Sequence, residues 1–380
     1  MESLAKWKEV CSDRPPCNEA DTSSFGMLEA LPDHLLILCL GGLSRYQLAR
    51  LQCVCHRFRN LLTPEILLEH RRREGLLEPW LCVVGGVHTG KQEEVAEMFD
   101  TRAQRWCSMP AFPSSTFFNF ACAVLKSRLY MVGGFASLSS MSPSVSVYDF
   151  STNTWHMVAA MQQTREAFAC GVVNGQIYVA GGLCRQPLHA SNPRINTAEV
   201  YIPELNIWRS IANMKEGRSC CASAVVGDKL FVIGGYGTES ILRTVEMYDP
   251  VIDNWETRCE MFGTWIIAGC AAIGHYIYVV GSNMLDMDSQ ELAVYDTHKD
   301  VWELQGSIPL SSLVIGLKCS LWGCAVAAIE GMLYVVGGAS SYDGGGLNLC
   351  LMYDPETAIW RTLQSMNSRR HGCAAAVISF

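Results

Sequence analysis

One spacing recurs six times and sets the architecture of most of the chain. An aromatic residue is followed seven positions later by tryptophan in the pairs Phe99/Trp106, Tyr148/Trp155, Tyr201/Trp208, Tyr248/Trp255, Tyr295/Trp302 and Tyr353/Trp360. Upstream of each pair an apolar run ends in a diglycine, at Gly85-Gly86, Gly133-Gly134, Gly181-Gly182, Gly234-Gly235 and Gly337-Gly338, with Gly281-Ser282 as the one departure. Units repeated at constant internal spacing predict an array in which each unit packs on its neighbours.

Each unit reads as four short antiparallel strands. Segments such as 176–180 and 229–233 are β-branched and aromatic and stop at glycine. A third strand ends at the aromatic residue of the pair. A turn such as Asp249-Pro250 follows, and then the strand that contains the tryptophan. Radially packed four-stranded sheets leave few exposed edges, so we expect a mainly β fold, a six-bladed propeller. The tryptophans are expected to pack between blades.

The two ends of the repeat region indicate how the ring closes. The first unit begins at Trp80 without the small-residue strand that starts the other units, and residues 371–380 are such a strand with nothing after it. We therefore expect the propeller to span 80–380 and the C-terminal strand 371–380 to complete the first blade.

Composition excludes several classes of protein. The formal net charge of −8 and the absence of a concentrated basic face argue against nucleic acid. The apolar run from Leu35 to Leu43 is too short to span a bilayer, and Met1–Cys17 lacks the apolar core of a signal peptide. The 18 cysteines do not form two CxxC pairs. We expect reduced thiols, no metal, no cofactor, no membrane partner, and a cytoplasmic or nuclear location.

With diglycine, Tyr-Asp and tryptophan at these spacings, the units resemble kelch repeats. The resemblance covers about four fifths of the chain and implies a kelch propeller. The departures are Phe99-Asp100 in the first unit, Tyr201-Ile202 in the third and Gly281-Ser282 in the fifth.

A different pattern precedes the propeller. Leucines spaced three, four and seven apart after Leu31-Pro32 predict short amphipathic helices, interrupted at Gly41-Gly42. Leu31-Pro32, the leucine-rich middle and Val54-Cys-His-Arg-Phe58 resemble an F-box. We expect a flexible segment over 1–27, an F-box module over 28–63 and a linker helix over 64–79, with Arg71–Arg73 on a solvated face.

An F-box followed by kelch repeats is typical of plant proteins. The resemblance implies docking to a Skp-type adaptor and, through it, to the cullin and RING subunits of a ubiquitin ligase. The positions expected to contact the adaptor or support that surface are Leu31, Pro32, Leu35, Leu36, Leu51, Val54 and Phe58. Leu51, Val54 and Phe58 are equally compatible with holding the helices together.

A protein substrate is expected on the face that carries the diglycine-to-tyrosine and post-tryptophan loops, because only those loops vary in length. Two of them are long, Gly181–Tyr201 and Trp302–Gly337. The position sixteen residues before each diglycine, here called the rim position, is Phe117, Arg165, Arg218, Trp265, Leu321 and, by correspondence, Arg370. Arginine forks there suit acidic or phosphorylated segments, or else pair with carboxylates of the propeller itself. The substrate-binding candidates are Phe117, Arg165, Arg218, Trp265, Arg370, Arg185, His189, Arg194, Phe135, Tyr236 and Tyr342.

Cysteines recur just inside the rim, at Cys122, Cys170, Cys221, Cys270, Cys324 and Cys373. They could line the central channel as sensors of oxidants or metal. The alternative, that crowding near the axis demands small side chains, is favoured.

These features favour a substrate-recognition subunit that is not itself an enzyme, with a protein target directed to ubiquitination and proteasomal degradation. The alternatives are a non-degradative kelch scaffold and, less favoured, a metal-dependent propeller enzyme using residues such as His189, Glu239 and Asp343.

Overall fold

A computed structural model describes residues 30–43, 45–86, 96–110, 118–137, 140–184, 194–264, 269–283, 286–310, 319–340 and 345–380. The segment 1–27, predicted to be flexible, lies outside these residues. The chain divides into two compact units: Met1–Glu78 together with Ser379–Phe380, and Pro79–Ile378.

The first unit is helical. Its helices are α3 (Asp33–Leu40), α4 (Arg45–Gln52), α5 (His56–Leu61) and α6 (Pro64–Glu74). Leu36, Leu48, Phe58, Leu62 and Leu67 are buried in one cluster, so α6 shares the core of the helices before it. The Thr63 hydroxyl accepts from the N–H of Ile66 at the start of α6, and Gly75 ends the helix with a φ of 66°, the left-handed conformation that glycine adopts easily.

Arg71 corrects one expectation for this unit. It was placed on a solvated face with its neighbours, but its side chain is only 3% exposed. The guanidinium donates to the carbonyl of Gly41 at 2.8 Å, to the carbonyl of Leu43, and to the carbonyl of Phe380 at 3.3 Å. Arg71 thereby satisfies carbonyls that follow α3, which the break at Gly41-Gly42 leaves without helical partners.

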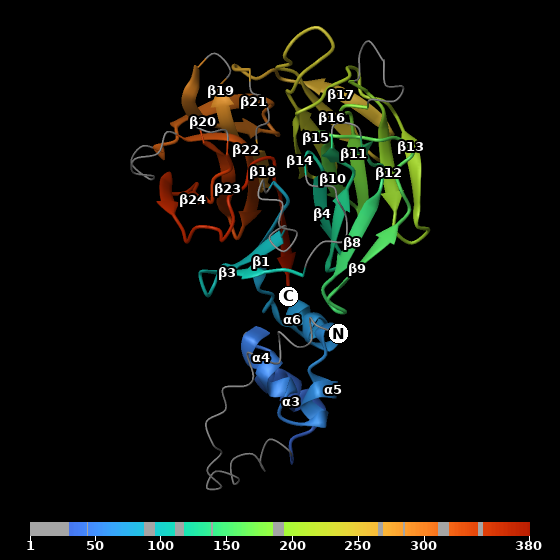
Figure 1. Cartoon of the computed structure of the whole chain (residues 1–380), viewed down its shortest axis with the longest axis vertical. Coiled ribbons are helices and arrows are strands. Elements are labelled where there is room, and N and C mark those ends of the chain that lie inside the picture. Colours follow the sequence, from blue (N-terminus) through green and yellow to red (C-terminus); the bar gives the residue numbers. More distant parts are fainter. Residues whose placement is uncertain are drawn as a thin grey trace. The chain divides into compact units, whose positions relative to one another are not determined.

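The second unit is built from six four-stranded sheets (Figure 1). In the first three the strand orders are β26-β1-β2-β3, β4-β5-β8-β9 and β10-β11-β12-β13, and in the last three β14-β15-β16-β17, β18-β19-β20-β21 and β22-β23-β24-β25. We call these blades 1 to 6 in that order. A short hairpin, β6-β7, belongs to the loop after β5.

The strands of blades 1 to 3 are β26 (Ala374–Ser379), β1 (Pro79–Val84), β2 (Ala96–Asp100), β3 (Arg105–Ser108), β4 (Ala121–Leu125), β5 (Arg128–Val132), β6 (Phe135–Ser137), β7 (Ser140–Met141), β8 (Val145–Asp149), β9 (Thr154–Val158), β10 (Ala169–Val173), β11 (Gln176–Ala180), β12 (Ala198–Ile202) and β13 (Ile207–Ile211). Those of blades 4 to 6 are β14 (Ala222–Val226), β15 (Lys229–Ile233), β16 (Val245–Asp249), β17 (Asn254–Arg258), β18 (Gly269–Ile273), β19 (Tyr276–Asn283), β20 (Asp286–Asp296), β21 (Val301–Ser307), β22 (Cys319–Ile329), β23 (Met332–Ser340), β24 (Cys350–Asp354) and β25 (Ile359–Thr362).

This arrangement confirms the six-bladed propeller. The first strands of successive blades contact one another, β4 with β10, β10 with β14, β14 with β18 and β18 with β22. The C-terminal strand β26 joins the sheet of β1, as the small-residue pattern predicted. The first blade is therefore assembled from both ends of the propeller sequence.

The repeated aromatic–tryptophan spacing is the geometry of one hairpin. Tyr201 lies directly opposite Trp208 in the β12–β13 ladder, and their ring centroids are 5.3 Å apart. The indole N–H of Trp208 donates to the carbonyl of Ala159, at the end of the preceding blade, at 2.9 Å. Trp255 and Trp302 make the same bond to Ala212 and Cys259. The prediction that these tryptophans pack between blades is confirmed at these positions.

The diglycines are required by close approach between blades. A Cβ on Gly181 would lie 2.6 Å from the carbonyl oxygen of Arg218 in the next blade, and Gly181 and Gly182 have φ values of 70° and 100°. In the fifth unit, with Gly281-Ser282, β19 does not stop but continues to Asn283. β23 likewise continues through the intact Gly337-Gly338 to Ser340, so strand length does not depend on this departure.

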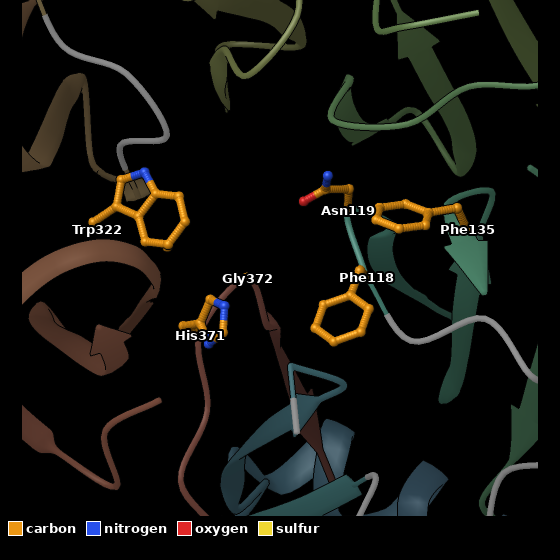
Figure 2. A pocket seen from close by; sticks show the side chains of 7 residues that line it. Phe118, Asn119, Phe135, Trp322, His371 and Gly372 are labelled. Carbon is orange, nitrogen blue, oxygen red and sulfur yellow. The ribbon is translucent and has the colours of Figure 1, made fainter. Parts of the chain in front are cut away.

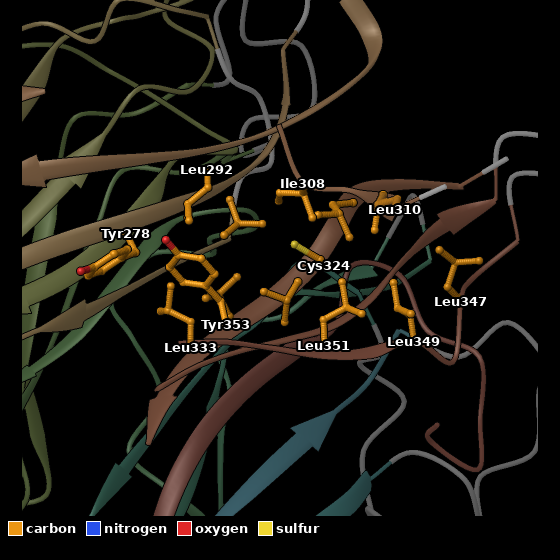
Figure 3. Close-up of a cluster of buried hydrophobic side chains, with 14 of the residues drawn as sticks. Tyr278, Leu292, Ile308, Leu310, Cys324, Leu333, Leu347, Leu349, Leu351 and Tyr353 are labelled. Carbon is orange, nitrogen blue, oxygen red and sulfur yellow. The ribbon is translucent and has the colours of Figure 1, made fainter. Parts of the chain in front are cut away.

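Hydrophobic side chains of neighbouring blades fill the space between the sheets. Figure 3 shows this between blades 5 and 6, where Tyr278 and Leu292 of one blade meet Leu333 and Leu351 of the other. Leu333 and Leu351 are fully buried.

Candidate functional site

Three of the predicted substrate-binding arginines are buried ion-pair residues, which corrects that prediction. Arg165, Arg218 and Arg370 are each 0% exposed. Their guanidinium groups lie 2.9, 2.6 and 2.8 Å from Glu199, Glu246 and Glu97, carboxylates of the blade that each arginine precedes. The alternative stated from sequence, a carboxylate partner within the propeller, is the one observed.

Each pair also satisfies backbone groups. Arg165 donates to the carbonyls of Gly181 and Thr197 at 2.9 and 2.7 Å, and Glu199 accepts from the N–H of Gln162 at 2.7 Å. Burial outweighs the carboxylate and lowers the pKa of Arg165 from its ordinary value.

The sequence held a signal for this arrangement. Blades 1, 3 and 4 carry arginine at the rim position and glutamate two residues before the aromatic residue of the pair. Blade 6 carries Leu321 and Leu351 at these two positions, and both lie in one hydrophobic cluster. In the sequence, glutamate at the second position thus occurs only in the blades that carry arginine at the first.

The remaining substrate candidates are placed differently. Phe117, Arg185, His189, Trp265 and Tyr342 lie outside the described residues. The Arg194 guanidinium lies 5.5 Å from the ring centroid of Tyr236, a cation–π contact that joins the ends of two neighbouring blades. Phe135 lines a pocket, together with residues that the sequence interpretation did not select.

That pocket, here called the aromatic pocket, has a volume of about 310 Å³ and is lined by Phe118, Asn119, Phe135, Trp322, Gly323, His371 and Gly372. Figure 2 shows Trp322 and His371 on one side of the space and Phe118 on the other. Trp322 and His371 stack with centroids 5.6 Å apart, and Phe118 lies 5.8 Å from Phe135. Phe118 and Asn119 precede β4, Phe135 begins β6, Trp322 and Gly323 lie in β22, and His371 and Gly372 precede β26.

Phe118, Trp322 and His371 each follow a rim position by one residue. Leu321 and Arg370 are 0% exposed, whereas Trp322 is 37% exposed. Because successive side chains of an extended chain point to opposite sides, selecting the rim residue selected the wrong side of the backbone. Trp322 lies in β22, within the long Trp302–Gly337 segment that was predicted to flank the entrance.

The residue after each of these has a left-handed backbone, and so do Ala167 and Cys220, each two residues after a rim arginine. The φ values are 53° at Asn119, 52° at Ala167 and at Cys220, 67° at Gly323 and 62° at Gly372. The N–H of Ala167 donates to Asn119, that of Cys220 to Ala167, and that of Gly372 to Gly323, at 2.8, 2.8 and 2.7 Å. We call these residues the backbone belt. No backbone hydrogen bond joins Asn119 to Gly372, two described members of the belt, and the aromatic pocket lies at that place.

The cysteines of the first strands are protonated thiols. Burial raises the pKa of Cys170, Cys221, Cys270 and Cys324 to about 12 and that of Cys373 to about 11. The Cys270 thiol donates to the carbonyl of Ser223 at 3.0 Å. Among the described residues no group of three or more His, Cys, Asp or Glu side chains is placed to hold a metal ion.

These pKa values predict selective alkylation. Because the thiolate is the reactive form, Cys170 and Cys221 should resist iodoacetamide at pH 8, where a thiol with a pKa near 12 is roughly 10⁻⁴ ionised. The exposed Cys39, Cys53 and Cys259 should react first. Peptide mass spectrometry of the native and the guanidinium-unfolded protein measures this. Fast native labelling of Cys170 or Cys221 would instead support a reactive channel.

The helical unit presents apolar side chains to solvent. Leu35 and Leu38, three residues apart on α3, are 37% and 53% exposed, and Val54 is 50% exposed. Pro32 is exposed as well, and Leu31 and Leu51 are half-buried against the core. Leu36 and Phe58 are buried, so they support this surface from within.

Arg57, near the start of α5, binds the segment at the start of α3. Its guanidinium forms an ion pair with Asp33 at 2.7 Å and donates to the carbonyl of Leu31.

The described helices include none that is long and apolar enough to cross a membrane.

Comparison with protein families assigns both units. Residues 28–69 match the F-box domain. Residues 76–264 match the KLHDC2/KLHL20/DRC7 Kelch-repeats domain, and residues 323–367 match the Kelch motif.

Individual proteins give the same picture. F-box/kelch-repeat protein At1g67480 of Arabidopsis thaliana is 27% identical over 213 residues, 55% of each chain. F-box/kelch-repeat protein SKIP30 of the same plant is 25% identical over 232 residues, 57% of this chain and 62% of that protein. The alignments thus span somewhat more than half of these relatives. The solved structure of YjhT has a TM-score of 0.56 at 14% identity, covers 71% of this chain and 91% of its own, and supports the fold alone.

Proposed function

Because the chain belongs to the plant-type F-box/kelch-repeat proteins, we propose that it is a substrate receptor of a cullin–RING ubiquitin ligase. Its F-box binds a Skp-type adaptor, and through that adaptor the cullin and RING subunits. Its propeller binds a target protein for ubiquitination and degradation, in the cytoplasm or the nucleus.

The observation that carries the proposal is the apolar surface of the F-box. Leu35, Leu38 and Val54 are exposed, while the core behind them is complete with Leu36 and Phe58 buried. Exposed leucines that the module does not need for its own packing are typical of a protein–protein interface.

The proposed chemistry is proximity. A receptor holds its target at high effective concentration beside the ubiquitin-charged enzyme, so the rate gain comes from positioning, and no side chain of this chain takes part in bond making. The ion-paired arginines and protonated thiols have structural roles that agree with this proposal.

Co-purification with a Skp-type adaptor tests the proposal. We expect wild type to bind and Leu35→Glu/Leu38→Glu to lose at least about 100-fold in affinity, since buried apolar anchors at interfaces cost about 2 kcal/mol or more each when replaced. The matched control is Leu76→Glu, which changes a leucine that is 37% exposed but lies outside the F-box match. Calorimetric Kd values and circular dichroism of each variant complete the measurement.

If folded wild type binds no Skp-type adaptor, the ligase role is wrong and a non-degradative kelch scaffold takes its place. If Leu76→Glu weakens binding as much as the double variant, the adaptor surface is not the one proposed.

A further inference from the structure

We infer that the aromatic pocket is the anchor site for one aromatic side chain of the target, presented on an exposed segment of that protein. The inference rests on the proposed receptor function and adds the class of residue that the propeller reads. It starts from Trp322, a residue that is 37% exposed although its ring stacks on His371. A large ring held open at a cavity mouth is typical of binding surfaces.

The walls of the pocket set the shape of the ligand. Rings of Phe118, Phe135, Trp322 and His371 surround a space of about 310 Å³ (Figure 2). That volume is at the lower end of the range of small-molecule sites, about 300–1,000 Å³, so it suits one side chain better than a folded element. Ring walls favour another ring over an aliphatic chain of equal size, because tilted and edge-on ring contacts add to the burial of apolar area.

Charge makes a cationic ligand the weaker candidate. The described lining holds no carboxylate that could pair with a lysine or arginine head group. A cation entering it would lose water and gain cation–π attraction from the ring faces but no opposite charge.

The polar atoms present favour a ring that carries a hydrogen-bond donor. The Asn119 amide faces the same space as the rings, and its oxygen lies 3.9 Å from a Cβ built on Gly372. An amide oxygen accepts the N–H of an indole or the O–H of a phenol. Tryptophan and tyrosine are therefore expected to bind better than phenylalanine.

The backbone belt explains why a ligand enters here. Successive backbone hydrogen bonds join Asn119 to Ala167 and Ala167 to Cys220, and so connect blades 2, 3 and 4. Between Asn119 and Gly372 no such bond is made, and the Cβ position of Gly372 opens toward the pocket. The first and second blades thus leave space at the mouth that a side chain can fill.

The experiment uses blocked amino acids as probes, because the target is unidentified. Saturation-transfer NMR of the full chain is recorded with N-acetyl amides of tryptophan, tyrosine, phenylalanine, leucine and lysine. We expect tryptophan and tyrosine to give the strongest signals and lysine the weakest. Trp322→Ala should reduce the affinity for the tryptophan probe at least tenfold. Phe262→Ala, which removes a ring that is 46% exposed outside the pocket, should leave it unchanged.

Each other result overturns the inference. If the lysine probe binds best, the pocket is a cation site. If the leucine probe binds as strongly as the tryptophan probe, the ring walls do not select aromatic side chains. If Trp322→Ala and Phe262→Ala behave alike, binding is elsewhere on the surface. Thermal unfolding curves of both variants show whether each is still folded.

Failure of this inference is distinct from failure of the proposed function. Trp322→Ala leaves the F-box untouched, so it should co-purify with the Skp-type adaptor as wild type does. Adaptor binding without probe binding removes only the aromatic anchor. Probe binding without adaptor binding keeps the pocket and removes the ligase role.

Discussion

Deletion of residues 371–380 should abolish the cooperative unfolding of the propeller, although it removes only the last ten residues. The deleted segment contains β26, the first strand of blade 1. Its loss exposes the edge of β1, whose Leu81 and Val83 are fully buried, and an uncovered apolar edge promotes aggregation. Domains have a net free energy of unfolding of only about 5–15 kcal/mol. Losing the packing and hydrogen bonds of one whole strand is therefore expected to remove most or all of that stability.

A pair of isoleucines gives a graded and matched form of this prediction. Ile378→Ala, at a fully buried position of β26, should cost about 2–5 kcal/mol and lower the Tm by at least about 5 °C. Ile359→Ala, at a position of β25 that is 47% exposed, should change the Tm by no more than about 2 °C. Scanning calorimetry measures both variants and the deletion. A deletion protein that melts within a few degrees of full length would show that β26 does not close the ring.

The aromatic–tryptophan spacing could be interpreted from sequence because all of its causes are local. Tyr201 and Trp208 face each other across one hairpin, and the turn between them fixes their register. Closure by the C-terminal strand could be inferred as well, since a strand missing at one end and surplus at the other leaves one solution.

The aromatic pocket could not be found this way, because its position depends on a backbone reversal that the sequence does not mark. The left-handed belt positions are Asn119, Ala167, Cys220, Gly323 and Gly372, and alanine and cysteine give no warning of a positive φ. The pocket also needs residues of three blades, which are separated along the chain by about the whole propeller. The rim position precedes the pocket-lining residues by one position, and its described members are buried. Choosing it therefore selected buried residues in place of those that line the pocket.

The buried arginines lead to the second large effect. Arg165→Leu should destabilise the propeller by about 3–5 kcal/mol, because it leaves the Glu199 carboxylate, 2% exposed, without its cation. The same substitution at Arg218 removes the partner of Glu246 and should cost a similar amount. Chemical denaturation at neutral pH gives the free energies of unfolding.

Blade 6 offers a comparison, because Leu321 and Leu351 lie in one hydrophobic cluster at the same sequence spacings, although a register shift between Ser320 and Cys324 displaces Leu321 in the ladder. Arg165→Leu/Glu199→Leu should therefore recover at least about 2 kcal/mol relative to Arg165→Leu, since a buried ion pair can be replaced by packed leucines far more cheaply than it can be broken. It should not regain all of the loss, because the carbonyls of Gly181 and Thr197 lose the donor that Arg165 provided.

The double-mutant cycle separates this account from a role in target binding. If Arg165 and Glu199 act as a pair, the two single losses will sum to more than the loss in the double variant, with a coupling of about 2 kcal/mol or more. Strictly additive losses would mean that the two side chains act independently. A double variant that is folded yet no longer binds a target, while the Trp322→Ala variant still does, would return the rim arginines to the substrate site.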